Sequence, residues 1–155
     1  MTCRLVPFSE IPSIMGTIVV GPPYSLTRED VDRFAVATWL DRVPPVGDPE
    51  HYPEGLVAGF HSLSLLDALS LMTLAFDTAS CWALNYGFDR VRFVEPLTVG
   101  EVVTPTFTFR EVRKKEPGYL VLRHCVLEIA GKDRPHLTAD WWDYVLPRDG
   151  PSPLR

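Results

Sequence analysis

Residues 59–84 read GFHSLSLLDALSLMTLAFDTASCWAL, and this stretch decides the expected fold. It contains no proline, and its only glycine is its first residue. Leucine, alanine, methionine and phenylalanine supply most of it, and these residue types favour or tolerate a helix. The apolar side chains point in every direction of a helical wheel instead of forming one stripe. A helix of that kind is either buried on all sides or lies in a membrane.

Polar residues decide between these two environments. A membrane span needs about 18 or more apolar residues with few charges. Here His61, Asp67 and Asp77 interrupt the run, together with five serines and threonines between residues 62 and 78. The stretch is therefore predicted to be a helix enclosed by the core of a protein.

Length and composition place limits on the rest of the molecule. A chain of 155 residues is long enough for one domain with a buried core, and we expect that domain to span residues 1–147, with residues 148–155 as a loose, proline-containing tail. The net charge is −5 and there is no basic run, which argues against nucleic acid or an anionic membrane as a partner. The N-terminus lacks the apolar core of a secretory signal.

The cysteines indicate the compartment. Cys3, Cys81 and Cys125 show no metal-ligand spacing, and an odd number of cysteines without a framework is typical of the reducing cytoplasm. We therefore expect a cytoplasmic protein with no metal site. The sequence also contains no phosphate-binding loop and no dinucleotide-binding glycine pattern, so no cofactor is expected.

The segments before the central stretch predict a strand, a helix and a loop. Residues 16–20 (GTIVV) are typical of a short strand. Thr27 is a suitable N-cap for an amphipathic helix of about 12 residues, with Glu29 and Asp30 in its first turn. Residues 41–56 contain four prolines and two glycines and predict a long loop. Such loops beside a rigid scaffold often carry function.

The segments after the central stretch alternate with the period of strands. Four strands are predicted, over residues 88–94, 102–112, 119–129 and 137–146. Pro105 interrupts the second of these and predicts a sheet edge or a bulge there, because proline donates no ladder hydrogen bond. A buried helix followed by a meander of strands indicates an antiparallel sheet curled around that helix.

Several segments, in this order and spacing, resemble the MaoC-like acyl dehydratases, also called (R)-specific enoyl hydratases, which have the hot-dog fold. The similarity covers about residues 16–147, and the segments are TREDVDRFAVAT (27–38), AGFHSLSLL (58–66), NYGFDRVRFVEPLTVGEVV (85–103) and GKDRPHLTADWW (131–142). The resemblance implies an α+β hot-dog fold, an antiparallel sheet wrapped around a long central helix.

The resemblance also implies an activity. Such lyases add water to enoyl thioesters, or remove it from 3-hydroxyacyl thioesters, of CoA or acyl carrier protein. They work as dimers without a cofactor, and the acyl chain enters near the subunit interface. The amides of Gly59 and Phe60 have no intrahelical acceptor and carry partial positive charge, so they are expected to hold the thioester oxygen as it becomes enolate-like.

The expected catalytic pair is incomplete. The family has an Asp just after the first helix and a His five residues later. Asp41 stands at or beside the first position, but the second is Val46. The family's His before the helix glycine is Ala58 here. Water chemistry on a thioester needs a carboxylate and an imidazole, so another residue has to supply the imidazole.

Five further residues are candidates for the site. His51 in the loop and His61 in the first turn of the central helix are candidate catalytic imidazoles, although a surface role for His51 and a core role for His61 are alternatives. Ser62 either binds the thioester or fills the helix. Asp67 is either a polar pocket residue or a carboxylate paired with an arginine or backbone. Asn85 either orients a ligand or serves a turn.

Three functions follow from the incomplete pair. The first is a hydratase or dehydratase with a rearranged Asp/His pair. The second is a non-catalytic subunit that binds an acyl group or completes a dimer, with a second copy or with another hot-dog chain. The third is a hot-dog thioesterase in which a carboxylate such as Asp41 or Asp67 activates water.

Overall fold

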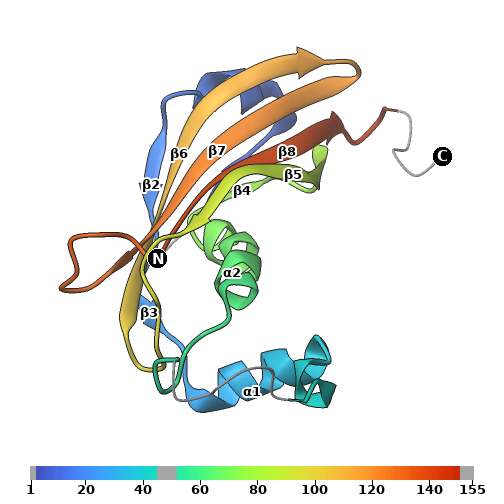
Figure 1. Cartoon of the computed structure of the whole chain (residues 1–155). Coiled ribbons are helices and arrows are strands. Elements are labelled where there is room, and N and C mark those ends of the chain that lie inside the picture. Colours follow the sequence, from blue (N-terminus) through green and yellow to red (C-terminus); the bar gives the residue numbers. More distant parts are fainter. Residues whose placement is uncertain (1–2, 45–51, 151–155) are drawn as a thin grey trace.

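The fold is a strongly curved antiparallel sheet that holds one helix, α2 (Gly59–Leu71), on its concave side (Figure 1). The computed structural model describes residues 3–44 and 52–150. The main sheet has the order β2-β6-β7-β8-β5, with β3 beside β6, and all its pairs are antiparallel. Its strands are β2 (Ile18–Val20), β3 (Tyr24–Ser25), β5 (Cys81–Phe93), β6 (Val102–Lys115), β7 (Gly118–Ile129) and β8 (Leu137–Pro147). The expected sheet around a central helix is confirmed.

The central helix is shorter than expected. The chain leaves the helix at Leu71, forms the short strand β4 (Leu74–Phe76), and enters β5 at Cys81. β4 pairs in parallel with β1 (Arg4–Val6), in a segment for which the sequence predicted no element. Leu74 and Phe76 are buried on either side of a half-buried residue, so the apolar run after the helix has the alternation of a strand. A prediction of helix from apolar content alone was wrong there.

The central helix is also not enclosed on all sides within one chain. Leu66 and Leu69 are buried against the sheet, whereas one stripe of the helix faces outward. The residues of that stripe recur at helical spacing: Phe60, Ser64, Asp67, Ala68 and Leu71. The sheet covers only one side of α2, which explains the difference from the prediction.

The first helix, α1 (Arg28–Ala37), lies on the side of α2 that is away from the sheet (Figure 1). The predicted N-cap is confirmed: the hydroxyl of Thr27 accepts a hydrogen bond from the Asp30 amide, and the Asp30 carboxylate accepts one from the Thr27 amide. None of the residues of α1 is fully buried. Its contact with α2 includes the Phe34 ring, which stacks on His61. A short 3-10 turn, η2 (Leu40–Arg42), follows α1.

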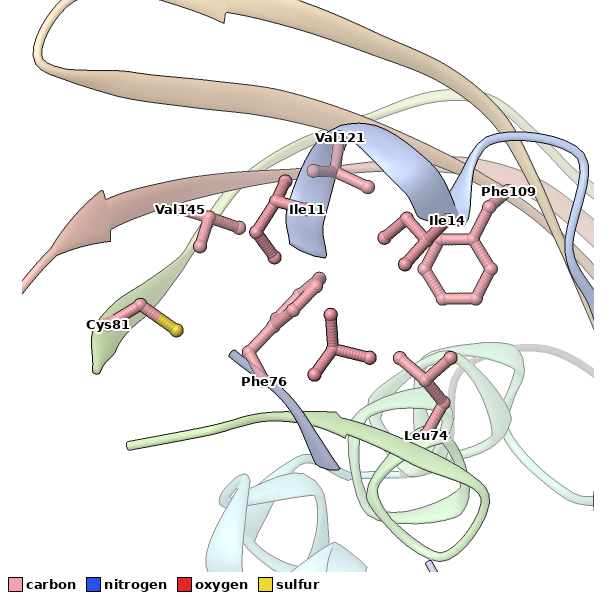
Figure 2. Packing of buried hydrophobic residues seen from close by; sticks show 9 residues of the cluster. Ile11, Ile14, Leu74, Phe76, Cys81, Phe109, Val121 and Val145 are labelled. Carbon is pink, nitrogen blue, oxygen red and sulfur yellow. The ribbon is translucent and has the colours of Figure 1, made fainter. Parts of the chain in front are cut away.

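The core consists of three clusters along the concave face. The middle cluster joins α2 to β6, β7 and β8. A second cluster lies beyond the end of α2, where the 3-10 helix η1 (Phe8–Ile14) places Ile11 and Ile14 against the sheet and β4 (Figure 2). A third cluster lies near the start of α2 and includes Val57, Leu97 and Ile129. The middle cluster packs α2 against the sheet, and the other two pack the segments that follow and precede the helix.

Pro105 lies within β6, opposite Leu127 of β7. On its other side, β2 pairs with residues 106–108 and β3 with residues 102–103. The missing donor of Pro105 therefore falls at the gap between two short edge strands, as expected for an edge position. The register shift of β6 lies further along, between Phe109 and Glu111.

Candidate active site

A cavity of about 430 Å³ lies at the start of α2. Its wall comes from the first turn of the helix, from the segment after β5 and from the residue before β8. The lining residues that the chemistry involves are Gly59, Phe60, Phe93, Glu95 and His136. Most of the wall is apolar, which is typical of a small-molecule site with a few placed polar groups.

The start of α2 supplies hydrogen-bond donors. The N-cap position is Ala58, and no side chain caps the helix, because a methyl group offers no acceptor. The first amides of a helix have no intrahelical acceptor, and together they carry partial positive charge. Gly59 also allows the Phe93 ring to approach, since a Cβ atom at this position would lie 2.8 Å from that ring. Gly59 and Phe60, which the sequence analysis expected to hold the thioester oxygen, both line this cavity.

A hydrogen-bonded chain of three groups lies behind this cavity. Ser62 is fully buried on the first turn of α2, and its Oγ lies 2.8 Å from Nε2 of the buried His136. Nδ1 of His136 lies 2.7 Å from the carbonyl oxygen of Glu95. Because a carbonyl only accepts, Nδ1 carries the proton, and the Ser62 hydroxyl donates to Nε2. Burial lowers the pKa of His136, so the imidazole is neutral at pH 7.

This Ser–His pair has the chemistry of a proton relay. A neutral imidazole accepts a proton at Nε2, and the hydroxyl between them passes one on. Sequence reasoning missed His136, which lies in the quoted segment GKDRPHLTADWW, 74 residues after Ser62. The only signal in the sequence was a His directly before an apolar strand. Its partner, Ser62, cannot be identified from the sequence, because the two residues meet only when the fold brings α2 beside the start of β8.

The predicted catalytic residues do not gather at this cavity. Asp41 lies exposed in η2 and is not part of the cavity wall. His51 lies outside the described residues. His61 is buried and faces α1, where its ring stacks on Phe34 with centroids 4.4 Å apart. Its Nδ1 is buried and has no hydrogen-bond partner among the residues that the structure describes, and burial lowers the pKa of the imidazole.

Asp67 and Asn85 meet at a different place. Both line a groove between α2 and β5, further along the helix from the cavity. The Oδ1 atom of Asn85 accepts a hydrogen bond from Nε1 of Trp141 at 3.1 Å. Asp67 is exposed on the outward stripe of α2, so it is not the buried carboxylate that an all-apolar helix implied. The described residues contain no group of three His, Cys, Asp or Glu side chains arranged to hold a metal ion.

Solved structures with the same architecture define the class of fold. A monoamine oxidase regulatory protein from Archaeoglobus fulgidus is similar over 97% of this chain and 100% of its own, with a TM-score of 0.72 and 22% identity. A MaoC-like dehydratase from Rhodospirillum rubrum covers 86% of this chain and 93% of its own, with a TM-score of 0.66 and 13% identity. An (R)-hydratase from A. caviae involved in PHA biosynthesis covers 85% and 95%, with a TM-score of 0.64 and 20% identity. The protein has the hot-dog fold of the MaoC-like dehydratases, as the sequence resemblance predicted.

Sequence comparison gives the family within this class. Nodulation protein N of Rhizobium leguminosarum bv. viciae is 36% identical in an alignment 153 positions long, gaps included, which covers 93% of this chain and 95% of that protein. Nodulation protein N of Rhizobium meliloti is 33% identical over 84 residues, about half of each chain. The chain belongs to the nodulation protein N family. No family model matches it.

Within residues 3–44 and 52–150, no helix is long and apolar enough to cross a membrane.

Proposed function

We propose that this protein is a hydratase or dehydratase that acts on enoyl or 3-hydroxyacyl thioesters of CoA or acyl carrier protein. The observation that carries the proposal is the cavity at the uncapped start of α2, with the Ser62–His136 pair directly behind it. The fold supports it, because two solved structures with this fold are named as a dehydratase and an (R)-hydratase.

The mechanism assigns one role to each group. The thioester oxygen accepts hydrogen bonds from the amides of Gly59 and Phe60, which stabilise the negative charge of the enolate. Ser62 is fully buried and is not part of the cavity wall, so the mechanism requires the reacting water to enter beside His136, which is part of it. In hydration, this water molecule gives a proton to the Ser62 hydroxyl, which passes its own proton to Nε2 of His136. The water oxygen bonds to Cβ while the electron pair of the double bond moves towards the thioester oxygen. A proton then returns to Cα, and dehydration follows the same steps in reverse.

The tautomer of His136 suits this role. The Glu95 carbonyl holds the proton on Nδ1, so Nε2 is the basic atom. The low pKa caused by burial keeps the imidazole unprotonated at neutral pH, which a base requires. In this proposal, the Ser62–His136 pair takes the place of the imidazole that the MaoC-like dehydratases have in the loop after the first helix.

We propose a homodimer as the active form. β5 is the last strand in the order of the main sheet, and a free edge with apolar side chains invites pairing with another chain. Large apolar residues are exposed on this strand and on the outward stripe of α2: Trp82, Tyr86, Phe88, Phe93, Phe60 and Leu71. A second copy fits this face because an isologous contact pairs the stripe with itself. A cytoplasmic location, which the free thiols of all three cysteines favour, is part of the same proposal.

One observation favours a second candidate function, an acyl-binding subunit without catalysis. Both ring nitrogens of His136 already have protein partners, and the exposed Asp41 does not line the cavity. An imidazole whose two nitrogens are both hydrogen-bonded fits a purely structural role, in which it holds α2 against the segment before β8. In that case the thioester binds at the start of α2 and is not converted.

The test is to incubate the purified protein with oct-2-enoyl-CoA and to follow the absorbance of the conjugated double bond. Loss of absorbance without release of free thiol is the expected result. Release of thiol identifies a thioesterase instead, and binding without either change identifies the non-catalytic subunit. The variant Asp41→Asn tests the prediction that Asp41 is catalytic. Loss of hydration in a folded variant supports that role, and full activity removes Asp41 from the mechanism.

A further inference from the structure

The proposed reaction moves a proton at each of two substrate atoms, and the Ser62–His136 pair serves only one of them. That pair handles the proton of the water molecule that reacts at Cβ. The proton at Cα needs a group of its own, because it is removed in dehydration and returned in hydration at a different atom. Asp41, the carboxylate that the sequence analysis expected for this chemistry, is exposed in η2 and does not line the cavity.

Another carboxylate does line the cavity at the start of α2. Among the described residues of the cavity wall, Glu95 is the only acidic one, and His136 is the only other one that titrates. The Glu95 amide donates to the carbonyl oxygen of Pro135 at 3.2 Å, and the Glu95 carbonyl oxygen lies 2.7 Å from Nδ1 of His136. The residue that holds the imidazole in place therefore also brings a carboxyl group to the cavity.

The carboxylate of Glu95 is only partly engaged by the protein. Its Oε1 lies 3.2 Å from Nη1 of Arg134, in the turn before β8, and the Glu95 side chain is 28% exposed. A carboxylate accepts hydrogen bonds at about four lone-pair positions, so a single arginine contact leaves most of them available. In contrast to the fully buried Ser62, this group is accessible to solvent.

The groups that the reaction needs surround the same cavity. In the proposed mechanism the first amides of α2 bind the thioester oxygen, and the Phe93 ring packs against Gly59, where a Cβ atom would lie 2.8 Å from it. The centroid of the Phe93 ring lies 6.2 Å from that of His136, and Glu95 follows Phe93 by two residues. Cα of an acyl thioester is bonded to the carbonyl carbon, so a thioester held at the start of α2 places Cα inside this wall.

We propose, on the basis of the proposed thioester site, that the Glu95 carboxylate is the catalytic base that removes the proton from Cα in dehydration and returns it in hydration. In dehydration the Cα–H bond breaks, an O–H bond forms on Glu95, and the electron pair moves to the thioester oxygen, which the amides of Gly59 and Phe60 stabilise. As the pair returns, the Cα–Cβ double bond forms and the Cβ–O bond breaks. The leaving hydroxide takes a proton from the Ser62–His136 pair, which regains one from water in the cavity. Glu95 gives its proton to solvent, which its partial exposure allows.

Exchange of the Cα hydrogen isolates this step from the water chemistry. Octanoyl-CoA is saturated and cannot gain or lose water, but its Cα hydrogen is replaced whenever a base removes it and returns deuterium. The protein is incubated with octanoyl-CoA in D2O, and deuterium at Cα is followed by mass spectrometry against a sample without protein. The wild-type protein is expected to exchange this hydrogen. Ser62→Ala, which lacks the relay for the water proton, should keep the exchange and lose hydration.

Glu95→Gln removes the base and keeps the rest of the residue. The side chain has nearly the same size, and the backbone carbonyl that holds His136 is unchanged. We expect the exchange to fall by about 10²–10⁴-fold, as for other losses of a placed acid or base, and hydration to fall with it, whereas octanoyl-CoA still binds in isothermal titration. Glu95→Asp keeps a carboxylate and should retain part of the exchange, which a purely structural role of the longer side chain does not explain.

Two matched controls lie in the turn before β8. Arg134→Gln breaks the ion pair with Glu95 and leaves the carboxylate in place. Asp133→Asn removes an exposed carboxylate that does not line the cavity. Both variants should exchange the Cα hydrogen at the wild-type rate.

The outcomes separate this inference from the proposed function. Wild-type exchange and hydration in Glu95→Gln overturn the role of Glu95 and leave the thioester site and the Ser62–His136 pair in place. Equal losses of exchange in Glu95→Gln and Arg134→Gln also overturn it, because the ion pair is then responsible. A wild-type protein that hydrates oct-2-enoyl-CoA but does not exchange the Cα hydrogen of octanoyl-CoA overturns it as well. If the wild-type protein does neither, the proposed function itself fails.

Discussion

Replacing Ser62 by Ala separates the two roles of the Ser62–His136 pair, structural support and proton transfer. The substitution removes one buried hydroxyl and leaves Nε2 of the buried His136 without its partner. An unsatisfied buried acceptor costs about 1–3 kcal/mol. For a domain of this size, each kcal/mol lowers Tm by about 2–4 °C. We therefore expect Ser62→Ala to reduce the free energy of unfolding by about 2 kcal/mol and Tm by roughly 4–8 °C.

A matched control exists on the same helix. Ser70 is also buried, but its hydroxyl donates to the backbone carbonyl of Asp67 at 2.8 Å. That carbonyl also accepts the ordinary hydrogen bond of the helix, so it is not left unsatisfied. Ser70→Ala should therefore cost well below 1 kcal/mol in the same urea titration. A cost equal to that of Ser62→Ala would mean that the hydroxyl–imidazole contact has no special weight.

Activity gives the second readout of Ser62→Ala. If Ser62 passes the proton to His136, the hydration rate of oct-2-enoyl-CoA should fall by about 10²–10⁴-fold, as for other losses of a placed acid or base. The rate is measured at a temperature well below the lowered Tm, so that unfolding does not contribute. A variant that is less stable but hydrates at the wild-type rate refutes the relay and leaves the pair with a structural role.

Three further predictions address the cavity at the start of α2, the buried ion pair of Asp143 with Arg123, and the dimer. Gly59→Ala places a Cβ atom 2.8 Å from the Phe93 ring, and the displaced ring should weaken octanoyl-CoA binding, with Phe93→Leu in the same chain restoring it; unchanged affinity contradicts the tight contact. Burial raises the pKa of Asp143 from 3.8 to about 6; the folded state then binds this proton more tightly, and stability is lost as pH rises from about 4 to 6. Asp143→Asn should abolish that loss in urea titrations across this range, so its stability should rise relative to wild type; parallel curves contradict the raised pKa. Leu71→Glu, on the outward stripe of α2, should give a monomer in sedimentation, whereas Val36→Glu, equally exposed on α1, should not; a monomeric wild-type protein rules out the homodimer.

Local patterns in the sequence predicted most of the fold. The capping residue Thr27, the alternation in residues 102–112 and 119–129, and the apolar content after Gly59 each depend on near neighbours in the chain. The error came at residues 72–84, because a short apolar run suits a helix or a strand equally well. β4 forms there because β1, about 70 residues earlier, offers it a parallel partner.

The candidate site was only partly accessible from the sequence, for a different reason. The donors at Gly59 and Phe60 follow from the start of a helix, which is a local property. The contact between Ser62 and His136 joins two elements that are distant in sequence, and either residue alone has a simple structural explanation. The exposed stripe of α2 was also hidden, because periodicity does not show whether the sheet or a second chain covers an apolar side chain.

Two carboxylates on β8 show how hydrogen-bonded partners and burial compete in setting the pKa of an acid in this sheet. Asp140 and Asp143 are both buried, and they point to opposite faces of the sheet. Asp140 accepts hydrogen bonds from His124 at 2.7 Å and from Nε of Arg90 at 2.6 Å, and these partners lower its pKa. This sheet can therefore satisfy a buried carboxylate with its own side chains. Asp143 forms an ion pair with Nη2 of Arg123 at 2.6 Å, and burial nevertheless raises its pKa to about 6. At Asp143 burial outweighs one ion pair, whereas at Asp140 the two hydrogen-bonded partners outweigh burial. A loss of stability as pH rises from about 4 to 6 is therefore expected from Asp143 and not from Asp140.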